Sequence, residues 1–397
     1  MLLLALTLLA AEPLLADQIA RMGSEFAALE KSFHNELVAA KHDNKKVSEA
    51  NRVYQEKWQK AAQEAIALVK GHPNDPAALD GILLLTGEMR WSLDEELTGI
   101  ALRNKHDTRM GRLCFNVLYR GGEPWAESIT EAVAESNPSR DIRAQAIFAQ
   151  GYQRYSKAFP YGTKVPDGER EPLVKEARKY FTDAAKYTDV KTPDGKSSIG
   201  LKATHELNRL DNIPNLKVGG IAPEIDASDL EGKRLKLSDY RGKVIMVVFW
   251  GSWCGPCMAM VPKEKDLWDR HKSKSFALLG VNCGDNREVA KRTVADRQMA
   301  WPSWYDGEEI RGPIETDYDL RNFKGEVCVD SRRYATRNRP RSAAAHSIAQ
   351  CHADPSHDRI IVFRFVGLSN RPDRRRLTRT TVGDPRRPFP RSSETER

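Results

Sequence analysis

The sequence of 397 residues has few of the residues that build disulfide scaffolds or metal sites: six cysteines and nine histidines. Cysteine is far too sparse for a disulfide-stapled scaffold, a class in which it typically exceeds about 8% of the residues. Only Cys254 and Cys257 lie close together, and the histidines have no ligand spacing, so no metal site is expected. Cysteine chemistry should therefore be concentrated at this one pair.

Long apolar runs are also missing. The run in MLLLALTLLAAEPLLAD covers about ten residues, which suits a secretory signal and is too short to span a bilayer. No Lys or Arg precedes it, and no A-x-A cleavage site follows. We expect residues 1–16 to be an export signal or short anchor that associates with a membrane; a buried first helix is the alternative.

Lysine nearly disappears from the carboxyl-terminal part of the sequence. Residues 321–397 contain 17 Arg and one Lys against eight Asp and Glu, whereas residues 1–320 contain 45 basic and 47 acidic side chains. Residues 331–397 are rich in Arg and Pro and are expected to form a disordered basic tail, in which only 359–367 reads as a strand. This tail is either a diverged final part of the fold or foreign to it, for example through a shifted reading frame; a nucleic-acid arm is the functional alternative. Because it lacks regular aromatic residues, no nucleic-acid partner is expected.

The region from 17 to 210 has the periodicity of helices. Its apolar residues recur every three or four positions, first from Ile19 to Leu37 and then from Tyr54 to Leu68. This pattern predicts an all-α domain of helical hairpins. No clean 34-residue period is present, so tetratricopeptide-like repeats and an irregular helical domain both remain open. Such a domain would bind or scaffold rather than catalyse.

Beyond Lys217 the pattern changes to strands alternating with helices, which predicts an α/β domain over residues 217–330. VIMVVFW (244–250) and FALLGVN (276–282) are continuous apolar runs, typical of strands buried on both faces. The segment between them reads as a helix that begins at the cysteine pair. Two other cysteines, Cys283 and Cys328, are expected to be buried strand residues.

Its place at the start of a helix, directly after a buried strand, suits the Cys254-Gly255-Pro256-Cys257 motif to redox chemistry. Free N–H groups and the helix dipole at a helix start lower the pKa of Cys254, while Cys257 lies within reach and should be more buried. Gly255 and Pro256 restrain the first turn. A structural zinc site would need a second pair, for which only Cys351-His352 with His357 is available. Redox exchange is favoured over zinc binding and over a chance pair.

The stretch GGIAPEIDASDLEGKRLKLSDYRGKVIMVVFWGSWCGPCMAMVP resembles the TlpA/ResA group of thioredoxin-like proteins in the redoxin superfamily. The resemblance covers residues 217–330, under a third of the chain. It implies a thioredoxin fold, no cofactor besides a redox-active disulfide, protein thiol and disulfide substrates, an upstream electron donor, and an extracytoplasmic setting. The catalytic residues carried over are Cys254 and Cys257, with Trp253 in support.

Three positions depart from the pattern of these relatives. Val248 stands where thioredoxins carry a buried Asp, and Met260 where TlpA/ResA-like members often place a Glu. Without such acids, apolar surroundings disfavour the Cys257 thiolate; Glu264 is a candidate substitute. Lys324 stands where a cis-proline usually shapes the substrate groove, and is a candidate groove residue.

The sequence thus favours a thiol–disulfide oxidoreductase. One alternative is a helical scaffold or binding protein with a degraded redox domain, suggested by the missing acids and proline. The other is a peroxiredoxin-like antioxidant, which is disfavoured because Gly251 occupies the position of the Thr that such enzymes need.

Overall fold

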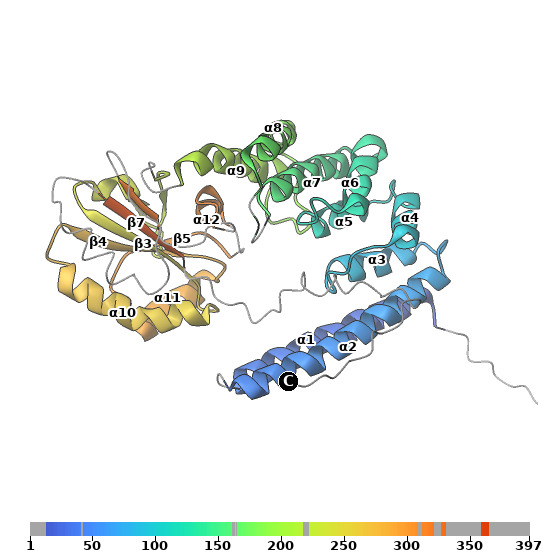
Figure 1. Ribbon diagram of the computed structural model, residues 1–397, viewed down its shortest axis with the longest axis horizontal. Coiled ribbons are helices and arrows are strands. Elements are labelled where there is room, and N and C mark those ends of the chain that lie inside the picture. The colour runs from blue at the N-terminus through green and yellow to red at the C-terminus, as the bar shows by residue number, and fades with distance from the viewer. Residues whose placement is uncertain are drawn as a thin grey trace, which may run out of the picture.

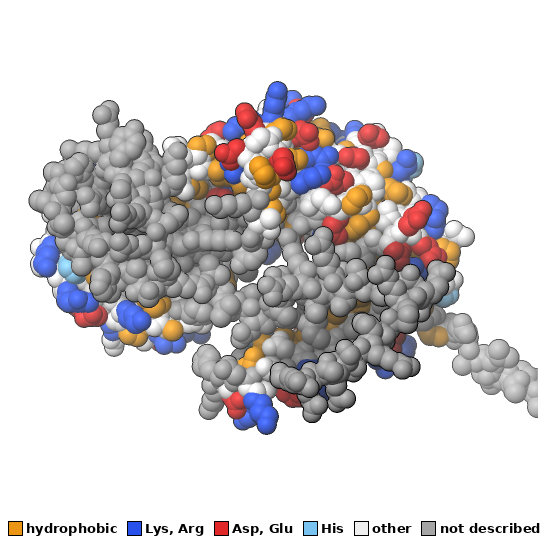
Figure 2. Space-filling view, in the orientation of Figure 1, with side chains coloured by type: hydrophobic (Ala, Val, Ile, Leu, Met, Phe, Trp, Pro, Cys, Tyr) orange, Lys and Arg blue, Asp and Glu red, His pale blue; other side chains and the backbone are white. Residues whose placement is uncertain are grey.

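The computed structural model describes residues 13–40, 43–160, 163, 165–216, 222–308 and 312–320, and the backbone of strands at 327–330 and 359–364. A helical part and an α/β part follow each other along the chain (Figure 1). Acidic and basic side chains are interspersed over the visible face of the helical part (Figure 2), in line with the balanced charge of residues 1–320.

Within the described residues, the helical part has nine α-helices: α1 (Leu15–Ala39), α2 (Asn44–Gly71), α3 (Ala78–Thr86), α4 (Glu95–Arg103), α5 (Met110–Asn116), α6 (Pro124–Ser136), α7 (Arg140–Ala158), α8 (Asp167–Ala184) and α9 (Ile199–Asn212). The α1 and α2 helices form a long hairpin, and α3–α9 continue toward the sheet (Figure 1). The expected helical character is confirmed, and its tetratricopeptide-like nature stays a prediction.

Small residues allow close helix packing in this part. A Cβ on Gly151 of α7 would lie 2.8 Å from the ring of Phe181 of α8, so the two helices could not approach so closely with a larger residue there. Phe148 stacks against the same region, with its ring centroid 5.7 Å from that of Phe181. Side-chain caps such as Ser139, which accepts from the N–H of Ile142, begin the helices.

The amino-terminal helix begins inside the segment expected to be a signal. The α1 helix starts at Leu15, and Leu15 and Ile19 are buried in the core of the helical part. Residues 1–12 lie outside the described residues, so the export signal stays a prediction. Among the helices that the structure describes, none is both long and apolar enough to cross a membrane.

The α/β part contains a five-stranded sheet in the order β5-β4-β3-β7-β6. Its strands are β3 (Val244–Trp250), β4 (Phe276–Asn282), β5 (Ser303–Tyr305), β6 (Val327–Asp330) and β7 (Arg359–Arg364), and β1 (Asp226–Ser228) pairs separately with β2 (Arg234–Lys236). Both β4 and β7 run parallel to β3, β5 runs parallel to β4, and β6 is antiparallel to β7. Helices α10 (Gly255–His271) and α11 (Arg287–Arg297) lie on one side of this sheet (Figure 1).

The centre of the sheet agrees with the sequence pattern. Every residue of β4 is buried, and so is every residue of β3 after Val244. Since the runs at 244–250 and 276–282 have no polar alternation, they can only be accommodated with both faces covered. The two strands pair in register from Val244 opposite Phe276 to Trp250 opposite Asn282, which brings their carboxyl ends together.

One segment of the Arg-rich tail is part of this sheet. The tail was expected to be disordered, with 359–367 as its only strand candidate; Arg359–Arg364 forms β7, an inner strand beside β3. The strand candidate is therefore confirmed over residues 359–364, where four consecutive apolar residues, IIVF, supply a strand despite the flanking arginines. The remainder of 331–397 lies outside the described residues.

A buried polar cluster joins the helical part to the α/β part. Helix α12 (Pro313–Asp317) lies next to α9, and Asn212 donates a hydrogen bond to the Asp317 carbonyl oxygen at 3.3 Å. Just beyond α12, the Asp319 carboxylate accepts a hydrogen bond from the Tyr155 hydroxyl. The buried Arg209 guanidinium stacks 3.7 Å from the Tyr155 ring centroid and pairs with Glu206. We call these residues the interdomain joint.

Removing one hydroxyl from this joint should weaken the protein measurably. Tyr155→Phe takes a donor away from the buried Asp319 carboxylate, and we expect a loss of about 1–3 kcal/mol in the free energy of unfolding. Urea unfolding followed by circular dichroism measures it. The control is Tyr187→Phe, a half-buried tyrosine whose ring carries a surface cation–π contact with Arg140. Equal, small losses in both variants would contradict the assigned role.

Candidate active site

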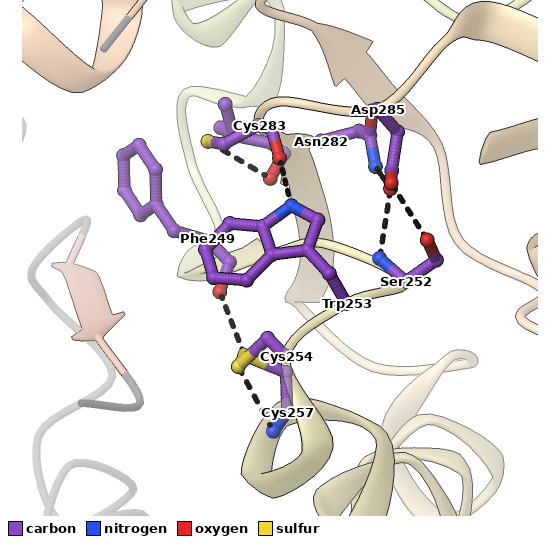
Figure 3. Close-up of a disulfide and its surroundings, with 9 residues drawn as sticks. Phe249, Ser252, Trp253, Cys254, Cys257, Asn282, Cys283 and Asp285 are labelled. Atoms are coloured by element: carbon purple, nitrogen blue, oxygen red, sulfur yellow. Dashed lines mark hydrogen bonds between the residues drawn. A yellow bond between two sulfur atoms is a disulfide. The ribbon is translucent and has the colours of Figure 1, made fainter. Parts of the chain in front are cut away.

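The cysteine pair lies where strand β3 passes into helix α10 (Figure 3). Cys254 and Cys257 form a disulfide with their Cα atoms 5.2 Å apart. Cys254 is the N-cap of α10, and its Sγ accepts the N–H of Cys257 at 3.3 Å. The residues are 6% and 5% exposed, so Cys257 is not distinctly the more buried one in the disulfide form.

The N-cap position gives the two sulfurs different surroundings. A Cys254 thiolate there faces the first N–H groups of α10 and the positive end of the helix dipole, which favour the charged form. The Sγ of Cys257 instead lies 4.0 Å from the carbonyl oxygen of Phe249, within the apolar core that also contains Val248. Both residues belong to this apolar core, but only the sulfur of Cys254 accepts an N–H of the first turn of α10.

The motif residues between the cysteines have different roles. Pro256 lies in the first turn of α10, where the missing N–H removes no helical hydrogen bond. A Cβ on Gly255 would meet no atom within 4 Å, so packing does not demand glycine there. Pro262 is accommodated inside α10, which continues to His271.

Trp253 is the exposed residue beside the disulfide, with 57% of its surface accessible. Its indole nitrogen donates a hydrogen bond to the Cys283 carbonyl oxygen at 3.0 Å, which holds the ring against the loop after β4. A Cβ on Gly251 would lie 2.4 Å from that indole nitrogen, so only glycine fits under the ring. Gly251 is a site residue whose steric role has no local signal in the sequence.

A buried carboxylate connects the two loops at this end of the sheet (Figure 3). Asp285 accepts hydrogen bonds from the Ser252 N–H at 2.8 Å, from the Ser252 hydroxyl at 2.6 Å and from the Asn282 side-chain amide at 2.7 Å. It is 5% exposed. These two loops are adjacent because β3 and β4 are parallel neighbours. Asp285 was not identified from the sequence, although this parallel pairing is the signal that places its loop beside Ser252.

The three residues that depart from the pattern of the ResA-like relatives are Val248, Met260 and Lys324, and they have different surroundings. Val248 is 1% exposed and belongs to the same apolar core as Cys257. Met260 is half-buried on α10. Neither position therefore offers Cys257 a carboxylate. Lys324, the candidate groove residue, lies outside the described residues.

Glu264 is a buried carboxyl group on α10, and burial raises its pKa to about 7. Its place seven residues after Cys257 puts it on the same helix face, but about 10 Å further along the axis. This separation is too large for a direct hydrogen bond between the two side chains. Glu264 is therefore not placed to take the Cys257 proton directly, although it titrates near neutral pH.

A second cluster of polar groups lies behind the Trp253 loop. Potential ligand atoms of Cys283, Asp306 and Glu315 lie within 4.8 Å of one another. The pKa of Asp306 is raised to about 8 by burial, and its oxygens accept the backbone N–H groups of Ile314 and Glu315 at 2.7 and 2.8 Å. Asp306 thus caps helix α12. The sequence-based expectation that the chain has no metal site stays a prediction.

The segment that contains this site is similar to known proteins. Residues 218–333 match the model of the AhpC/TSA family. The thiol-disulfide oxidoreductase ResA of Geobacillus kaustophilus is 41% identical over 116 residues, which make up 28% of this chain and 66% of that protein. ResA of Bacillus cereus is 28% identical over 109 residues, or 26% of this chain and 63% of the relative.

A solved structure is also similar. The thioredoxin domain of a thiol-disulfide oxidoreductase from Bacteroides vulgatus has 22% sequence identity and a TM-score of 0.31, covering 34% of this chain and 98% of its own. The chain spans between 56 and 66% of the length of the ResA proteins that it matches first. The expected resemblance to ResA-like thiol–disulfide oxidoreductases, an enzyme class, is confirmed for this segment.

The buried Glu264 gives a stability prediction with a definite sign. Its folded pKa of about 7 exceeds the unfolded value of about 4.3, so between these values the unfolded chain loses the proton first. The free energy of unfolding therefore falls as the pH rises between these two pKa values. Above pH 7 the full loss is present. Relative to wild type, Glu264→Gln should gain about 2–3 kcal/mol more at pH 8 than at pH 5 in urea unfolding.

The control for this experiment is Glu288→Gln, an exposed position on α11. It should change stability by the same small amount at both pH values. A Glu264→Gln effect that does not depend on pH would show that the carboxyl group does not titrate in this window.

Proposed function

We propose that the protein is a thiol–disulfide oxidoreductase that exchanges disulfides with protein substrates through Cys254 and Cys257. The observation that carries the proposal is the disulfide at the N-cap of α10, directly after the buried strand β3 and beside the exposed Trp253. The match of residues 218–333 to the AhpC/TSA family and the similarity of a 116-residue segment to ResA support the same chemistry.

The exchange begins from the reduced pair. The Cys254 thiolate attacks one sulfur of a substrate disulfide, so a Cys254–substrate bond forms while the substrate S–S bond breaks, and the leaving sulfur takes up a proton from solvent. Cys257 then loses its proton and attacks the Cys254 sulfur. The second substrate thiolate leaves and is protonated. Two electrons have passed to the substrate, and Cys254–Cys257 is oxidised. A dithiol donor upstream reduces the pair again by the reverse steps.

The second step is the demanding one in this protein. Cys257 must become a thiolate among apolar neighbours that include Val248, and desolvation disfavours its charged form. With no carboxylate at 248 or 260, its proton leaves to substrate or solvent. We therefore infer a resolving step slower than the initial attack.

We also propose where the protein acts and which surfaces bind its partners. Trp253 offers an apolar surface for a substrate chain next to the pair, and Lys324 is proposed to line the remainder of the groove. We propose an extracytoplasmic location, with residues 1–16 as the export signal or membrane anchor. The helical part, with its tetratricopeptide-like hairpins, is proposed to bind a partner protein.

Substitution of each cysteine tests the proposal. The full chain should reduce insulin in the presence of dithiothreitol, and Cys254→Ser should abolish that activity because the attacking sulfur is gone. Pre-reduced Cys257→Ser, freed of dithiothreitol before insulin is added, should accumulate a Cys254–insulin mixed disulfide, detectable as an added mass. The control is Cys114→Ser, a buried thiol of α5 that is remote in sequence from the pair and should retain activity.

Two results would contradict the proposal. Equal insulin reduction by wild type and Cys254→Ser would place the chemistry elsewhere. Rapid consumption of hydrogen peroxide that depends on Cys254, without disulfide exchange, would instead support an antioxidant.

A further inference from the structure

Asp285 is a buried acid whose hydrogen bonds are directed at the loop that carries the nucleophile. Three donors reach its carboxylate, and two of them belong to Ser252. Among the described residues, no Lys or Arg forms an ion pair with it. Burying a carboxylate costs free energy unless hydrogen bonds compensate for it. Hydrogen bonds to an ionised carboxylate are strong, so they hold Ser252 and Asn282 in place.

The segment that these bonds fix is four residues long. The Cys254 N–H donates to the Gly251 carbonyl oxygen at 3.0 Å, which closes a turn between the end of β3 and the start of α10. Within this turn, Ser252 is bound to Asp285 and Trp253 is bound to the Cys283 carbonyl oxygen. Two consecutive residues of the turn are thus attached to the loop after β4.

We propose that Asp285 is a positioning residue for the nucleophile: by holding Ser252 it keeps the reduced Cys254 at the amino end of α10. The inference rests on the proposed function. In the oxidised protein the disulfide itself ties Cys254 to Cys257 in the first turn of the helix. Once that bond is reduced, the side-chain hydrogen bonds of Ser252 and Trp253 still attach the turn to the loop after β4, beside the backbone bond from Cys254 to Gly251. The contribution of Asp285 therefore falls on the reduced state.

Two possible effects of Asp285 change the pKa of Cys254 in opposite directions. As a positioning group, Asp285 keeps the Cys254 sulfur in reach of the Cys257 N–H and so lowers the pKa of Cys254. As a bare negative charge nearby, it would raise that pKa. Besides Cys257, the titratable residues of α10 lie nine or more positions beyond Cys254, and Cys283 follows β4; those of α10 are Lys263, Glu264, Lys265, Asp266, Asp269, Arg270 and His271. The direction of the change in a variant therefore identifies the role.

The test uses the reduced full chain and the pH dependence of Cys254 alkylation by iodoacetamide, read by mass spectrometry of the peptide that contains Cys254. Asp285→Asn replaces one acceptor oxygen with an amide that cannot accept from Ser252. We expect the pKa of Cys254 to rise and its alkylation at pH 7 to slow by about three- to tenfold. The reduction potential should become more negative, by about 30 mV for a tenfold change.

Two further variants keep the result interpretable. Ser252→Ala removes the hydroxyl donor and leaves the charge of Asp285 in place, and it should raise the pKa of Cys254 by less than Asp285→Asn does. Asp296→Asn, at an exposed position of α11, removes a charge without a hydrogen bond and should change nothing. If Asp285→Asn fails to fold, Ser252→Ala decides.

An unchanged or lowered pKa of Cys254 in Asp285→Asn, or in Ser252→Ala where the first variant does not fold, would overturn the proposal. This outcome is separable from failure of the proposed function. Iodoacetamide titrates Cys254 whether or not the protein reduces insulin, and inactivity of the wild type toward insulin would leave the titration readable.

Discussion

The placement of Cys254 as the N-cap of α10 is the constraint on which the site depends. Strand β3 is buried on both faces, and only the four residues from Gly251 to Cys254 carry the chain from its end to the start of the helix. Within this short connection the sulfur must meet the N–H of Cys257, the indole of Trp253 must face outward, and Gly251 must pass beneath the ring. The loop after β4 satisfies these demands by contributing Asp285 and the Cys283 carbonyl oxygen, which is available because β3 and β4 are parallel and in register.

The same region of the α/β part is connected to the helical part. Asp306 follows β5 and caps α12, and beyond α12 the Asp319 carboxylate meets Tyr155. Arg209 is buried in that joint, where a charged guanidinium persists only with partners such as Glu206 and the tyrosine ring. A joint of buried charges and hydrogen bonds has strict geometry, so it defines how α9 and α12 meet, whereas a purely apolar contact could slide. The helical part is thereby held at one side of the redox domain.

Much of this architecture could be predicted from the sequence because its signals are local. Unbroken apolar runs identified β3 and β4, a three-to-four residue period identified the helical part, and the cysteine spacing after a strand identified the pair. The contacts that position the pair and those of the interdomain joint are not local: Ser252 and Asp285 are 33 residues apart, and Tyr155 and Asp319 are 164 apart. Nothing in the residue types alone matches such partners. The strand β7 also has a local signal in its four apolar residues, but its place beside β3 could not be predicted, since the surrounding Arg- and Pro-rich composition is typical of disorder.

We propose that Cys254 and Cys257 form a working redox couple although Val248 and Met260 offer Cys257 no carboxylate. The reduction potential of the wild-type pair, measured by equilibration with glutathione buffers, tests it most directly. We expect a single two-electron transition with a reduction potential between about −120 and −270 mV, the range of thiol–disulfide exchange proteins. A pair that forms no stable disulfide in these buffers, or that cannot be reduced by them, would contradict the account and leave a scaffold with a degraded redox domain as the better description.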